Sequence, residues 1–306
     1  MTQSDTPDRF IQGEERWSSF AGHGFRMRYL YLKAERPSGL PAVVFIHGFL
    51  GYSFSWRFNM QEFARTRDVY AVDLLGIGYS DRPPFGAVSF TLADSAQRML
   101  GWLQELGLSD VDLVGTSHGG ALSMVMAALD AAQPRRAIGR LILVAPANPY
   151  SRTGRKRLWF FNTRFGAWFL RFSGGGKGGV KDWALGRMYG DIRKLTGETR
   201  RGYRTMLAQA GSLDYALAVI RTFKKDLQEI FGLIPEITDI PTLIVWGEKD
   251  ITVPRANAEP LAAHFRHVRL VIMPGSGHLP YEEDPALFNR EVLSYLDDTS
   301  CAKAGA

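Results

Sequence analysis

Six short apolar runs recur along this chain of 306 residues, and they limit its fold more than any other feature. Each run holds four or five residues and is apolar at nearly every position rather than at alternate ones. This pattern is typical of parallel strands that are covered on both faces. Helical stretches separate most of the runs, so the sequence predicts a mostly parallel, doubly wound sheet of the α/β class. The runs are 42–46, 69–72, 111–114, 141–144, 242–245 and 268–272.

Two local signals add detail to this plan. Residues 15–34 show short alternating stretches on either side of the turn Gly22-His23-Gly24, which predicts an antiparallel hairpin. Thr91 is followed three residues later by Asp94, an arrangement that resembles a capping box and predicts a helix from there to about Gly107.

The alternation of strands and helices stops between residues 148 and 237. This stretch is rich in arginine and aromatic residues, includes the glycine-rich segment 173–179, and contains no buried strand pattern. It is predicted to be a mainly helical insertion within the parallel sheet. The chain is therefore divided into a core formed by 1–147 and 238–306 and an insertion formed by 148–237.

A candidate nucleophile lies between one of the predicted strands and a helix. Gly115-Thr116-Ser117-His118-Gly119 follows the strand 111–114 and precedes the helical stretch 121–129. A serine on so tight a strand-to-helix turn takes a strained backbone conformation, and small neighbours let strand and helix approach while the hydroxyl projects. The structural alternative is a loop serine that happens to be bordered by glycines.

A serine hydroxyl needs a base, and the base needs an orienting acid. His278 follows the last apolar run on a glycine-rich loop, at the sheet edge where catalytic groups gather in open parallel sheets. Asp250 follows the preceding run, and Glu248 is its local competitor. The order Ser117, Asp250, His278 is that of α/β-hydrolase triads. The backbone N–H groups of Phe49 and His118 are the expected donors to the oxyanion.

Together these segments resemble the α/β-hydrolase superfamily over about residues 15–297. The resemblance implies a nucleophile elbow at Ser117 and places the insertion where that family carries its helical cap. Epoxide hydrolases and haloalkane dehalogenases share the D-x-x-G-x-G-x-S stretch but use an aspartate nucleophile, which Ser117 replaces here. The matching segments are 47–49, 73–80, 115–119, 247–250 and 277–278.

The resemblance favours a serine hydrolase that cleaves a carboxylic ester of a small or lipophilic substrate through an acyl-enzyme. Two alternatives stay open: hydrolysis of a carbon–carbon bond in a vinylogous diketone of the ring-fission type, and a hydrolase-like binder of small molecules. No metal-ligand or dinucleotide motif is present, so neither a metal nor an organic cofactor is expected.

Charge is concentrated in the insertion. Residues 148–231 hold seventeen Lys or Arg against six Asp or Glu, in a chain whose net charge is +6. Together with the aromatic residues in 152–172, this suggests either peripheral contact with an anionic membrane or a solvated basic face. Nucleic-acid binding is not expected, because no recognised module accompanies the charge.

The N-terminal residues show no signal peptide and the chain holds one cysteine, which favours a cytoplasmic protein. The sequence does not indicate the oligomeric state.

Overall fold

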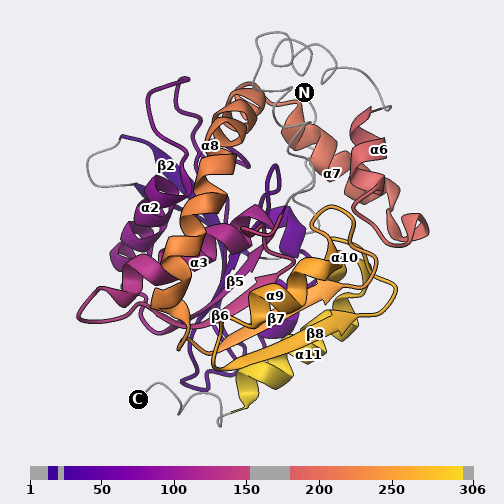
Figure 1. The fold of residues 1–306 in the computed structure, drawn as a ribbon. Helices are drawn as coiled ribbons and strands as arrows, with labels where there is room; N and C mark the ends of the chain where they lie inside the picture. Colours follow the sequence, from indigo (N-terminus) through magenta and orange to yellow (C-terminus); the bar gives the residue numbers. More distant parts are fainter. Residues whose placement is uncertain (1–12, 20–23, 152–179, 299–306) are drawn as a thin grey trace.

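The computed structural model describes residues 13–19, 24–151 and 180–298. Its centre is one sheet of eight strands in the order β1-β2-β4-β3-β5-β6-β7-β8 (Figure 1). In this order the six strands from β4 to β8, β3 included, are parallel. The strand β2 is antiparallel to both of its neighbours, β1 and β4. The strand bounds are β1 Glu14–Ser19, β2 Arg26–Leu32, β3 Val43–Ile46, β4 Val69–Val72, β5 Val111–Thr116, β6 Ile138–Val144, β7 Thr242–Gly247 and β8 Val268–Met273.

Helices cover both faces of this sheet. Side chains of β3 point alternately to the two faces: Val44 and Ile46 pack in the core beneath α2, α3 and α9, whereas Val43 and Phe45 pack beneath α1 and α11. The helix bounds are α1 Met60–Phe63, α2 Leu92–Glu105, α3 His118–Ala131, α9 Ala258–Ala262, α10 Pro280–Glu283 and α11 Pro285–Asp297, with the 3₁₀ turns η2 Ser53–Trp56 and η5 Arg255–Asn257.

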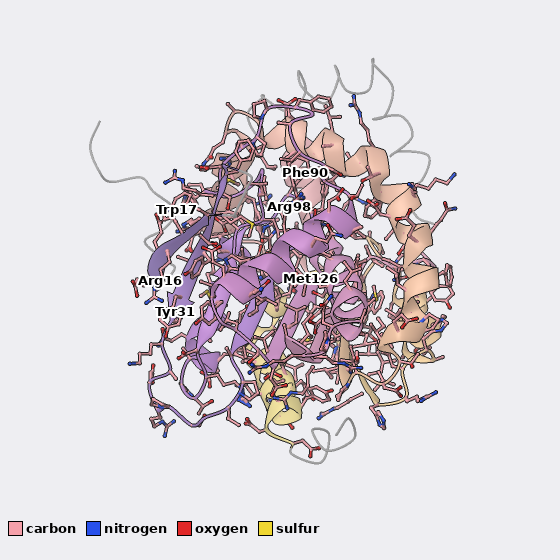
Figure 2. All side chains as sticks on the ribbon, turned by 90° about the vertical axis from the view of Figure 1, so that its left-hand side faces the viewer. Arg16, Trp17, Tyr31, Phe90, Arg98 and Met126 are labelled. Carbon is pink, nitrogen blue, oxygen red and sulfur yellow. The ribbon has the colours of Figure 1, made fainter. Side chains whose placement is uncertain are left out.

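The sequence-based plan of the sheet is confirmed. All six apolar runs form parallel strands, and Glu14–Ser19 and Arg26–Leu32 pair as the antiparallel strands β1 and β2. Gly22 and His23 of the predicted turn lie outside the described residues. The hydroxyl of Thr91 accepts the N–H of Asp94 at 3.1 Å and caps α2, as the capping pattern predicts. The edge strand β1 is charged, and the Arg16 guanidinium lies 4.0 Å from the ring centre of Tyr31 (Figure 2). Charges of this kind discourage edge-to-edge pairing with another chain.

The described parts of the insertion between β6 and β7 are residues 148–151 and 180–237, and helices are the only regular elements in them. They are α6 Val180–Gly186, η3 Ile192–Lys194, α7 Gly197–Leu207, α8 Ser212–Leu233 and η4 Ile234–Ile237. The basic aromatic segment 152–172 lies outside the described residues. Figure 1 shows α6 and α7 side by side at one end of the sheet, with α8 crossing near α2 and α3. Among the helices described, none is both long and apolar enough to cross a lipid bilayer.

Candidate active site

Ser117 occupies the sharp turn between β5 and α3. Its backbone angles, φ 52° and ψ −117°, are strained for a residue with a side chain. Glycine is required two positions later for a steric reason, because a Cβ at Gly119 would lie 2.6 Å from the carbonyl oxygen of Ile46. Glycine therefore lets the start of α3 pack directly against the end of β3. The tight turn is the strand–turn–helix context expected for the G-x-S-x-G sequence.

His278 and Asp250 meet at the same edge of the sheet. Asp250 follows β7 and His278 follows β8, and these neighbouring strands are parallel, so their carboxyl ends lie side by side. The Nδ1 atom of His278 is 2.7 Å from Oδ2 of Asp250. Both residues are buried, with 1% and 5% of their surface exposed. The predicted base and acid therefore form a close hydrogen-bonded pair.

The second oxygen of Asp250 fixes the orientation of its carboxylate. Oδ1 accepts the backbone N–H groups of Thr252 at 2.8 Å and Val253 at 3.1 Å. The competitor Glu248 is exposed and instead accepts the N–H of Gly275 at 2.8 Å. Of these two acids, Asp250 is the one that contacts the imidazole. A carboxylate on Nδ1 favours a proton at that nitrogen and leaves Nε2 as the basic nitrogen.

A cavity of about 270 Å³ connects the predicted residues. Ser117 and His278 both line it, together with Phe49 and His118. The Nε2 atom of His278 is buried and has no hydrogen-bond partner in the described structure. The structure thus brings the predicted nucleophile, the predicted base and both residues expected to supply oxyanion donors to one cavity. The predicted acid is hydrogen-bonded to the predicted base.

The backbone N–H groups of Phe49 and His118 are available for a ligand. Neither donates a hydrogen bond to another of the residues described. His118 is the first residue of α3, and the first N–H groups of a helix have no partner within it. They also carry the positive end of the helix dipole, which stabilises negative charge.

The side chain of His118 is buried between aromatic rings. Its ring lies 6.4 Å from that of Phe223 and 6.5 Å from that of Phe49, centre to centre. Burial lowers the pKa of His118 to about 4, with a smaller contribution from nearby His47. The imidazole is therefore neutral near pH 7.

The side chain of His47 has a structural role. Its Nδ1 donates to the carbonyl of Gly48 at 2.8 Å, and its Nε2 accepts the N–H of Leu74 at 3.0 Å. Both ring nitrogens are thus occupied by backbone groups, and burial lowers the pKa of His47. His47 joins the turn after β3 to the turn after β4.

The D-x-x-G-x-G-x-S segment, residues 73–80, also has a structural role. The Asp73 carboxylate accepts the N–H groups of Ser53 at 2.7 Å and Tyr79 at 2.9 Å, and Arg28 lies 3.2 Å from it. The hydroxyl of Ser80 donates to the carbonyl of Asp73 at 2.5 Å. This buried network fixes the loop after β4.

A buried polar cluster behind the cavity was not predicted from the sequence. Glu282 forms an ion pair with Arg57 at 3.0 Å and accepts the hydroxyls of Tyr189, at 2.8 Å, and Tyr203. The hydroxyl of Ser55 lies 3.0 Å from that of Tyr203, and both residues line the cavity. Burial raises the pKa of Tyr203 well above its usual value, so its hydroxyl keeps its proton. The only sequence signal is a run of three acidic residues, 282–284, shortly after His278.

Comparison with known proteins agrees with this architecture. A family model described as the alpha/beta hydrolase fold matches residues 41–285. Epoxide hydrolase 3 of Mus musculus is 27% identical over 288 residues, covering 89% of this chain and 74% of that protein.

Two solved structures show the same fold at lower identity. A thermophilic esterase from Thermogutta terrifontis has a TM-score of 0.74 and 21% identity, covering 96% of this chain and 100% of the esterase. The meta-cleavage product hydrolase CumD has a TM-score of 0.71 and 21% identity, covering 95% and 99% of the two chains. The protein described here belongs to the α/β-hydrolase fold family, which is a family of hydrolytic enzymes.

Proposed function

We propose that the protein is a serine esterase that cleaves carboxylic esters of small lipophilic substrates through an acyl-enzyme on Ser117. The observation that carries this proposal is the pair of His278 and Asp250, 2.7 Å apart, whose imidazole shares a cavity with Ser117. A base oriented by a buried carboxylate is the arrangement that activates a serine hydroxyl.

The proposed reaction has two halves. Ser117 attacks the ester carbonyl while Nε2 of His278 takes its proton, and the N–H groups of Phe49 and His118 receive the negative oxygen. His278 then passes the proton to the departing alcohol, which leaves Ser117 acylated. In the second half His278 takes a proton from water, the resulting hydroxide attacks the acyl carbonyl, and the acid is released as Ser117 regains its proton.

The composition of the cavity wall favours a small, uncharged substrate. The described residues that line the cavity include no Lys, Arg, Asp or Glu, and much of the wall is formed by apolar side chains such as Leu185, Val219 and Ile220. A volume of about 270 Å³ falls just below the range common for drug-sized ligands. We therefore expect short acyl chains to be preferred over long ones.

The residue at the nucleophile position argues against epoxide chemistry, despite the similarity to epoxide hydrolase 3. In the resemblance described above, those enzymes attack with an aspartate carboxylate, and this chain has Ser117 at that turn. For the carbon–carbon alternative, a ring-fission substrate brings a carboxylate into the cavity, and a buried carboxylate requires a compensating partner. The described part of the wall supplies no cation for that purpose.

A substrate panel tests the proposal. The purified protein is assayed against p-nitrophenyl esters of increasing acyl length and against a coloured ring-fission dienoate, with Ser117→Ala in parallel. We expect turnover of the short esters that is abolished in Ser117→Ala. Consumption of the dienoate without ester turnover would establish the carbon–carbon reaction instead, and binding without any turnover would establish a binder.

A further inference from the structure

The loop that carries His278 is held from two sides. On one side is the loop after β7: the N–H of Lys249 donates to the carbonyl of Ser276 at 2.8 Å, and Glu248 accepts the N–H of Gly275 at 2.8 Å. On the other side is segment 188–191 of the insertion. The N–H of His278 donates to the carbonyl of Met188 at 2.6 Å. The proposed base is thus hydrogen-bonded through its own backbone to the insertion.

One carboxylate joins these two backbones. Glu283 is buried, with 6% of its surface exposed. Its Oε1 accepts the N–H of Gly277 at 2.6 Å, and its Oε2 accepts the N–H groups of Gly190 at 2.9 Å and Asp191 at 3.1 Å. Burial raises the pKa of Glu283, and the three backbone hydrogen bonds act against that rise. Both oxygens are therefore needed, one for each chain segment.

The two segments are packed with no space for a side chain between them. A Cβ on Gly277 would lie 2.5 Å from both the nitrogen of Gly190 and the carbonyl oxygen of Met188. A Cβ on Gly190 would overlap the carbonyl of Gly275 and lie 2.7 Å from the nitrogen of Gly277. A displacement of segment 188–191 must therefore displace the loop before His278.

We propose that Glu283 is a positioning residue, which holds the insertion against Gly277 and thereby fixes the imidazole of His278 toward Asp250 and the cavity. The inference rests on the proposed function, because it assigns the support of the base in that reaction. Glu283 acts through the loop and makes no contact with substrate in this role. An error of about 1 Å in the placement of a catalytic group can cost about 10²-fold in rate.

A pair of matched variants tests the carboxylate. Gln has one acceptor oxygen, so Glu283→Gln must lose the bond to Gly277 or those to Gly190 and Asp191. The control is Glu248→Gln on the loop after β7, where one acceptor oxygen is sufficient for the single N–H of Gly275. We expect Glu283→Gln to lower kcat about tenfold or more with KM changed less than threefold. Glu248→Gln should stay within twofold of the wild type.

A second pair tests the insertion side without altering Glu283. Gly190→Ala places a methyl group against the backbone of Gly275 and Gly277, whereas in Gly186→Ala the new methyl group meets only the flexible end of Ile192. We expect Gly190→Ala to reproduce the fall in kcat and Gly186→Ala to leave it unchanged. If Glu283→Gln does not fold, this pair of variants still tests whether the contact between segment 188–191 and Gly277 supports catalysis.

A spectroscopic readout separates positioning from a merely structural role. The downfield NMR signal of the His278 Nδ1 proton, which reports its hydrogen bond to Asp250, requires no substrate. We expect the signal in the wild type and both controls, and its loss or broadening in Glu283→Gln and Gly190→Ala. A normal signal and normal kcat in both of those variants would overturn the proposal, even if they melt at lower temperature. Ester hydrolysis by Ser117→Ala would refute the proposed function alone, and the NMR signal would still decide the role of Glu283.

Discussion

The replacement of Asp250 by asparagine has a predictable outcome, because the loop dictates which way the amide points. The oxygen that accepts the N–H groups of Thr252 and Val253 must remain an oxygen, since an NH₂ group there would oppose two donors. The amide nitrogen of Asp250→Asn must then take the position of Oδ2, 2.7 Å from Nδ1 of His278. A donor at that position forces the histidine proton onto Nε2.

A protonated Nε2 cannot take the proton of Ser117. The corresponding change in serine proteases, which also gives the wrong tautomer with intact geometry, lowers kcat about 10⁴-fold. That factor corresponds to about 5.4 kcal/mol of transition-state stabilisation. We expect a loss of this order for Asp250→Asn, with little change in melting temperature because the residue keeps its shape and its two backbone hydrogen bonds.

The assay is steady-state hydrolysis of a short p-nitrophenyl ester, with melting temperature measured on the same samples. Glu248→Gln is the matched control, because Glu248 lies two residues away, is exposed and does not contact the imidazole. A loss of less than tenfold in Asp250→Asn would refute the tautomer argument. A larger loss in Glu248→Gln than in Asp250→Asn would show that the acid has been wrongly identified.

Three further predictions follow from the site and the charge pattern. Ser117→Ala and His278→Ala should each abolish ester hydrolysis, and the double variant should be no worse, because the residues act as one unit; additive losses would contradict this. The pKa of His118 falls from 6.5 to about 4 on folding, so the unfolded chain binds more protons between these values and stability decreases as pH falls. The loss in unfolding free energy amounts to about 3 kcal/mol by pH 4. Urea unfolding at pH 7 and pH 4 should show that His118→Phe lacks this loss; a difference between the two pH values as large as in the wild type would refute the prediction. If segment 152–172 contacts membranes, the protein should co-sediment with anionic but not neutral vesicles in low salt, and binding should weaken as salt rises; no anionic-specific binding would identify a solvated basic face.

Local patterns explain why so much of the sheet could be predicted. Most of the parallel strands are apolar at successive positions because both of their faces are covered, and a run of four residues is enough to show this pattern. The turn at Ser117 is equally local, since the strained backbone of Ser117 and the need for glycine at position 119 both arise from contacts within one turn and the adjoining strand. The close approach of Asp250 and His278 was predictable because parallel strands bring their carboxyl ends to one edge.

The supporting contacts could not be predicted in the same way. Arg57 and Glu282 are separated by 225 positions in the sequence, and Gly190 and Glu283 by 93. Nothing near either residue indicates its partner, because the pairing depends on how the insertion packs onto the core. A buried carboxylate bonded to backbone N–H groups also has no sequence signature, since any residue except proline supplies that donor.

The close approach of the backbones at Gly190 and Gly277 has a consequence for recombining this protein with its relatives. A chimera that exchanges the whole insertion, 148–237, would separate segment 188–191 from the glycine and carboxylate that were matched to it. A crossover that transfers 188–191 together with 275–283 would keep both contacting segments from the same parent protein. Substrate preference could then be changed by exchanging other parts of the insertion, with the support of the base left intact.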